Sequence, residues 1–169
     1  MLLMVTFSSC TKKEDNTTEK YYLHFKANGE EKSYINVISD YNFIKLHNEH
    51  LLFYIRGHEL LGVSNNNSVL SIQIDASITD DQDNLTGINI VAGTYTSNDD
   101  PSRYKLNCNY YPTGTDNYTI HNQNFTLKIE YLDKKITRGT FSGVLKNENG
   151  DIINITDGAF NIRVNYNEI

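Results

Sequence analysis

Apolar and polar residues alternate along most of the chain after residue 20, and this period of two constrains the fold more than any other feature. Successive side chains of a β-strand point to opposite faces, so an alternating segment can bury one face and leave the other in water. The clearest apolar sets are Tyr21, Leu23, Phe25 and Ala27; Leu70, Ile72 and Ile74; Phe125, Leu127, Ile129 and Tyr131; and Phe160, Ile162, Val164 and Tyr166. No segment keeps an amphipathic helical period over about 11 residues, the shortest window that identifies one.

Turn-forming residues separate the alternating segments. The pair Asn28-Gly29 follows the first segment, and "KNENG" joins "KKITRGTFSGVL" to "DIINIT" as a predicted hairpin. The polar stretches "TDDQDN" and "TGTDNYTIHNQN" are expected to be connections. The spacing indicates about ten or eleven short strands, which is typical of sandwiches and barrels. We therefore expect a single all-β domain over residues 21–169, an antiparallel β-sandwich or barrel.

The composition suits one packed domain and disfavours two classes of partner. Hydrophobic residues make up 38% of the 169, and 12 tyrosines and 7 phenylalanines supply bulk for a core. The charged fraction of 21% is below that of a disordered chain. The net charge is −6, whereas nucleic acids and anionic lipid surfaces attract basic proteins. We expect neither nucleic-acid binding nor electrostatic docking on a membrane.

The opening "MLLMVTFSSC" combines an apolar run, two small residues and a cysteine. This arrangement predicts a lipoprotein signal peptide over residues 1–9, with Cys10 as the acylated N-terminal residue of the mature protein. The polar segment "TKKEDNTTEK" after Cys10 then serves as a flexible tether, so that residues 10–20 link the acyl chains to the domain. No Lys or Arg precedes the apolar run, and we interpret this as a start codon that lies upstream of Met1. The alternative is a first β-strand with a core cysteine.

The chain has two cysteines, which would suit a disulfide in an exported protein. Acylation of Cys10 would exclude that bond. Cys108 lies in "RYKLNCNYY", where Tyr104, Leu106, Cys108 and Tyr110 alternate with polar residues. We therefore predict that Cys108 is a small core residue on the apolar face of a strand.

The segment "ITRGTFSGVLKNENGDIINITDGAFNIRV", residues 136–164, resembles the C-terminal hairpins of small outer-membrane lipoproteins of unknown function found in Bacteroidetes. "HFKANGE" and "AGTY" are similar to further segments of that family, and "KKED" resembles its signal for export to the outer face. The resemblance implies an outer-membrane lipoprotein facing the cell exterior, and it carries over no catalytic residue. Within this block, Gly139 and Gly143 suggest a close approach between strands, and Asp157-Gly158 suggests a turn.

Two clusters raise a metal hypothesis, and both are interpreted as solvated surface: the histidines His47, His50 and His58, and the acidic loop Asp80, Asp81, Asp83 and Asn84. The histidines do not form the helical H-E-x-x-H pattern, and the acidic loop lacks the glycine and glutamate of an EF-hand. A weak calcium site in the loop stays open as an alternative. Neither a G-x-S-x-G nucleophile motif nor a phosphate-binding glycine loop occurs in the sequence. We expect no catalytic residue, no metal and no cofactor.

Tyr111 and Tyr118 flank the turn "PTGTD" and are candidates for an exposed ligand platform. Tyrosines with polar neighbours can stack on sugar rings or contact a protein partner. The alternative is that their rings belong to the sheet and only their hydroxyls reach water. The expected function is a non-catalytic binding or interaction domain at the cell surface, with a protein or glycan ligand. Two other functions remain open: a lipocalin-like carrier with an apolar cavity, and a structural subunit with an apolar patch or an open edge strand.

Overall fold

The computed structural model describes residues 21–34, 36–44, 49–58, 68–76, 78–79, 85–86, 90–99, 101, 103–113 and 115–168. These residues form strands and connections without a helix, which confirms the predicted all-β class. The strands are β1 (Tyr22–Ala27), β2 (Glu30–Tyr34), β3 (Asn36–Ile44), β4 (Glu49–His58), β5 (Val69–Asp75), β6 (Ile78–Thr79), β7 (Leu85–Thr86), β8 (Gly93–Thr96), β9 (Lys105–Tyr111), β10 (Tyr118–Leu132), β11 (Ile136–Lys146) and β12 (Ile152–Glu168).

The main sheet closes on itself and makes the domain barrel-like. Its strand order is β11-β10-β9-β5-β4-β3-β12, and β12 also pairs with β11. All of these pairs are antiparallel except β12 with β3, which is parallel. The hairpin of β1 and β2 extends the sheet from β12, and β8 pairs with β10. A closed sheet leaves few strand edges exposed.

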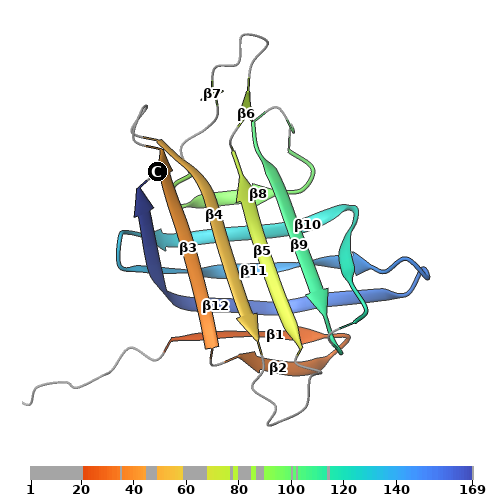
Figure 1. Ribbon diagram of the computed structural model, residues 1–169. Helices are drawn as coiled ribbons and strands as arrows, with labels where there is room; N and C mark the ends of the chain where they lie inside the picture. The colour runs from red at the N-terminus through yellow and green to blue at the C-terminus, as the bar shows by residue number, and fades with distance from the viewer. Residues whose placement is uncertain are drawn as a thin grey trace, which may run out of the picture.

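Figure 1 shows β3, β4, β5 and β9 side by side in one layer, crossing in front of β10, β11 and β12. β12 belongs to both layers because its first part pairs with β11 of the rear layer and its last part pairs with β3 of the front layer. Strands that pass from one layer to the other make the corners of such orthogonal packings.

Aromatic and aliphatic side chains fill the space between the layers. The Phe25 ring lies 5.5 Å from the Tyr34 and Tyr110 rings and 6.0 Å from the Phe141 ring, measured between centroids. The predicted inward residues of β5 and β9 are buried, including Cys108 at 1% exposure, and so are Phe160, Ile162 and Val164 of β12. Edge-to-face ring contacts of this kind add to the stability that burial provides. The alternating pattern therefore identified most of the core.

Two tyrosines expected on apolar faces are exposed. Tyr21 precedes β1 and lies 37% exposed, and Tyr131 is 39% exposed. Ile129 pairs with Gly139 but Tyr131 pairs with Arg138, so β10 has one extra residue, Glu130, at this point of the ladder. This β-bulge reverses the alternation and turns the Tyr131 ring outward, where the Arg138 guanidinium lies 5.1 Å from its centroid.

Two segments expected to be connections are parts of strands. The stretch from Tyr118 to Asn124, expected to be a polar connection, is the start of β10. The segment "GTYT", to which no structure was assigned, forms β8. The expected turn at Asp157-Gly158 is wrong, because β12 continues through it as one strand. Asp157 has a φ of 52°, so the predicted positive φ is present, but it serves a bulge at which β12 shifts register against both β11 and β1.

Candidate functional site

The two tyrosines predicted as a platform lie on opposite faces of the sheet. Tyr111 ends β9 with its side chain half-buried on the outer face, whereas Tyr118 begins β10 and is only 9% exposed in the core. Tyr118 pairs with Tyr110, whose ring is also interior. The structure therefore does not bring Tyr111 and Tyr118 together as one exposed surface. The alternative, a ring within the sheet and a hydroxyl directed outward, describes Tyr118 better.

The other residues singled out in the sequence divide between the described and undescribed parts of the chain. Cys108 is buried as a free thiol, and its burial raises the pKa of the thiol far above its usual range. His58 lies half-buried on the outer face of β4, and the described residues contain no cluster of His, Cys, Asp and Glu that would hold a metal ion. Cys10, His47, the side chain of His50 and the acidic loop at residues 80–84 lie outside the described residues.

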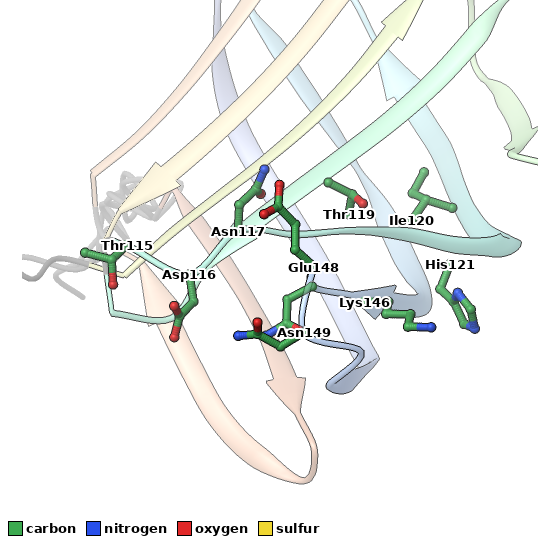
Figure 2. A pocket seen from close by; sticks show the side chains of 10 residues that line it. Thr115, Asp116, Asn117, Thr119, Ile120, His121, Lys146, Glu148 and Asn149 are labelled. Carbon is green, nitrogen blue, oxygen red and sulfur yellow. The ribbon is translucent and has the colours of Figure 1, made fainter.

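A polar cleft lies between the start of β10 and the turn that joins β11 to β12 (Figure 2). Its volume is about 470 Å³. Figure 2 shows that the lining side chains come from the β10 side and from the turn, and that they carry amide, hydroxyl, carboxylate, imidazole and ammonium groups. The lining residues are Thr115, Asp116, Asn117, Thr119, Ile120, His121, Lys146, Asn147, Glu148 and Asn149.

A distortion of β10 and a firmly closed turn shape this cleft. Asn122 and Gln123 have positive φ values of 49° and 53°, and the register of β10 against β11 is interrupted between Ile120 and Phe125. Non-glycine residues avoid this region of φ, so two in succession mark a strained segment. Across the cleft, the Asp151 amide donates to the Asn147 Oδ1 at 2.8 Å, and the Asn147 amide donates to the Asp151 carbonyl at 3.1 Å. This closes the predicted "KNENG" hairpin.

One acceptor beneath the cleft has no donor. The Oδ1 of Asn117 is buried and forms no hydrogen bond within the part of the chain that the structure describes. A buried polar atom without a partner costs about 1–3 kcal/mol of stability. Burial raises the pKa of the nearby Tyr118 hydroxyl, and the carboxylates of Asp151 and Asp116 raise it further. The phenol therefore stays neutral, as a hydrogen-bonding group, at physiological pH.

The chemistry of this cleft suits binding by hydrogen bonds. Asn, Thr and Asp side chains offer both donors and acceptors, which match the hydroxyl and amide groups of a polar ligand. Sequence reasoning interpreted this region only as a polar connection. The signal available was the density of Asn, Asp and Thr in residues 113–124 and 147–151, but the sequence did not show that the two segments meet.

A second, shallower groove of about 390 Å³ crosses the outer face of β4, β5 and β9. It contains Tyr111, which is the part of the predicted platform that the structure retains. Its lining residues are Tyr54, Arg56, Val69, Ser71, Asn109 and Tyr111.

Comparison of the chain with protein-family models, curated proteins and solved structures found no match. The resemblance to outer-membrane lipoproteins therefore stays a prediction. Among the described residues, no helix is both long and apolar enough to cross a membrane.

Proposed function

We propose that this chain is a lipid-anchored, non-catalytic binding protein whose β-domain holds a polar ligand at the cell surface. The observation that carries the proposal is that the polar clefts lie on the outside of the domain. Among the clefts bounded by described residues, the cleft beside the β11–β12 turn and the groove on β4, β5 and β9 open to solvent and are lined mainly by polar groups, whereas aromatic side chains occupy the interior. Open polar clefts favour a binding role, because a carrier of apolar ligands needs an enclosed apolar cavity.

The anchoring half of the proposal rests on the sequence. In "FSSC", Cys10 follows two small residues, and the charged segment "TKKEDNTTEK" that comes next contains no apolar residue. Each buried methylene of an acyl chain contributes about 0.8 kcal/mol, so two or three chains would hold the domain on a membrane. The resemblance to Bacteroidetes lipoproteins supports the outer face of the outer membrane as the location.

Intact mass of the mature protein from membranes, together with protease treatment of whole cells, tests the anchor. We expect a mass that begins at Cys10 with added acyl chains, and cleavage by external protease. Cys10→Ser should leave the domain folded and move it to the soluble fraction. A Cys10→Ser protein that remains in the membrane fraction would contradict the acylation.

The binding half is tested with the full chain carrying Cys10→Ser. Amide NMR spectra are recorded with a panel of sugars and amino acids, and separately with an apolar fluorescent dye. We expect a polar compound to shift the amides of Asn117, His121 and Asn149. The variant Glu148→Gln should weaken that binding, whereas the control Glu130→Gln, on the exposed face of β10, should not.

The same spectra distinguish the two other functions. Tight binding of the dye with shifts of core amides such as Phe53 would favour the lipocalin-like carrier over the polar-cleft proposal. Self-association without any ligand response would favour a structural subunit. The exposed apolar residues Tyr21, Val91, Tyr131 and Ile152 are the surface to examine in that case.

A further inference from the structure

The groove on the outer face of β4, β5 and β9 has an ordered arrangement of side chains that goes beyond the polar cleft. Arg56 of β4 pairs with Ser71 of β5, and Ser71 pairs with Asn109 of β9, so these three form one row across three strands. Tyr54 lies two residues from Arg56 on the same face, and Tyr111 lies two residues from Asn109 in the opposite direction. A polar row is therefore flanked diagonally by two tyrosines (Figure 1 shows the three strands side by side).

The polar groups of this row are available to a ligand. Within the described part of the chain, the side chains of Arg56, Ser71 and Asn109 form no hydrogen bond or ion pair, and Arg56 is exposed. The neighbouring Tyr54 and Tyr111 are half-buried, so part of each side chain is accessible to solvent. A guanidinium with its donors unused can bind a carboxylate through two parallel hydrogen bonds.

The charge of the groove is opposite to that of the chain. The chain carries a net charge of −6, whereas the groove is lined by one arginine and no carboxylate. Asp75 of β5 shares this outer face, where its Cα lies opposite that of Lys105 of β9. Asp40 of the neighbouring β3 lies opposite Tyr54 on the same face, and its side chain is outside the described residues. Asp75 lies four residues along β5 from Ser71, which is about 13 Å at 3.4 Å per residue. Screening at physiological salt acts over about 8 Å, so Asp75 is largely screened from Arg56, and Arg56 is the charged group that lines the groove itself.

The geometry of the three strands argues against an extended peptide as the occupant. A peptide that binds a sheet by strand addition needs a free edge. β5 is paired along both sides, by β4 and β9, and β4 is paired by β3 and β5. β9 pairs with β10 at Asn109 and Tyr110. Along the row of Arg56, Ser71 and Asn109, the groove therefore offers side chains and no backbone edge to a ligand.

We propose that this groove is a binding site for an acidic oligosaccharide. The Arg56 guanidinium binds a uronic-acid carboxylate, Ser71 and Asn109 hydrogen-bond to ring hydroxyls, and Tyr54 and Tyr111 contact the faces of sugar rings on either side. Two strand spacings and four residues separate the two tyrosines, a diagonal of about 16 Å between their Cα atoms. That span suits an oligosaccharide of several rings. The site is separate from the polar cleft, and it does not depend on acylation of Cys10.

Calorimetric titration of the full chain carrying Cys10→Ser tests the proposal with oligomers of galacturonate, mannuronate–guluronate and glucuronate–glucosamine. Each oligomer is paired with its carboxyl-reduced, neutral counterpart. We expect at least one acidic oligomer to bind, with affinity that falls at higher salt and is lost on carboxyl reduction. Arg56→Gln should weaken that binding about tenfold or more, as expected for hydrogen bonds to a charged group. Tyr111→Leu should weaken it also.

Lys105→Gln is the matched control, because it removes one positive charge from the same outer face but outside the groove. We expect it to bind as the parent chain does. Circular dichroism and urea unfolding confirm that each variant is folded. Absence of binding to every acidic oligomer would overturn the proposal, and so would binding that survives Arg56→Gln or that Lys105→Gln weakens equally. Equal binding of the neutral counterparts would overturn the assignment of the carboxylate to Arg56.

Discussion

Replacing Gly139 by alanine tests how closely β10 and β11 approach each other. Gly139 pairs with Ile129, and a Cβ atom built on Gly139 would lie 1.9 Å from the Lys128 carbonyl oxygen and 2.8 Å from the Phe160 Cζ. The first contact is with backbone, so it cannot be relieved by a side-chain rotation. The strands would have to separate locally, or β11 would have to shift.

The change in the free energy of unfolding caused by Gly139→Ala is the sum of opposing effects. Inserting a methyl into a packed region costs about 1–3 kcal/mol, and each ladder hydrogen bond that lengthens costs about 1 kcal/mol more. Alanine restricts the unfolded chain and returns about 0.4–1 kcal/mol. We therefore expect Gly139→Ala to lower the free energy of unfolding by about 2–3 kcal/mol. For a domain of this size, each kcal/mol lowers Tm by about 2–4 °C.

Gly93→Ala is the control, because Gly93 is also a strand glycine but the nearest atom to its built Cβ, the Tyr95 Cε2, is 3.9 Å away. We expect this variant to be as stable as the parent chain or slightly more stable. Urea unfolding followed by circular dichroism compares the two variants in the chain carrying Cys10→Ser. Equal unfolding midpoints for Gly139→Ala and Gly93→Ala would refute the argument that strand approach requires a glycine at position 139.

Three further predictions concern single groups. In the chain carrying Cys10→Ser, Cys108 is the only thiol, and it is buried. We therefore expect it not to react with a disulfide reagent at pH 8 until urea unfolds the domain. Rapid reaction in the native protein would contradict the packing of β9. The Tyr104 hydroxyl donates to Asp99, and this bond is the main cause that holds the pKa of Asp99 below its usual value. A carboxyl whose pKa is lowered by folding adds stability above its unfolded-state pKa and loses it as the pH falls through the folded-state pKa, so this contribution declines below about pH 4. Tyr104→Phe should raise the pKa of Asp99 in a carbon-13 NMR titration, and an unchanged titration would exclude the bond. Asp157→Ala should cost about 1 kcal/mol more than Asp157→Gly in urea unfolding, because the φ of 52° is disfavoured for a side chain with a Cβ.

The interior residues were largely predictable from sequence because burial in a strand is a local property. Leu70, Ile72 and Ile74 alternate with polar residues, and all three are fully buried. Cys108 follows the same rule on β9. Tyr131 does not follow the alternation, because a single bulge in β10 shifts its phase. Whether a bulge forms depends on the pairing with the neighbouring strand, which is not a local property.

The candidate sites were less predictable, since each is made by segments that are distant in the chain. Tyr111 was identified from its polar neighbours, and it lines the outer groove. Its partners in that groove, Tyr54 and Arg56, lie on β4 and carry no local signal of their own. Tyr118 had the same sequence signal as Tyr111, but the register of β10 with β9 turns its ring into the core.

By itself, the sequence determined that the chain is all-β, most of the residues that face inward, and where one hairpin turns, because a period of two and the turn residues act within a few positions. The acylation at Cys10 is likewise a local prediction, and it still needs its experiment. Only the tertiary structure decided that β12 closes the sheet by pairing with both β11 and β3, and that β5 lies between β4 and β9. Which strands become neighbours depends on loop closure and on the packing of two layers, and no local pattern encodes either.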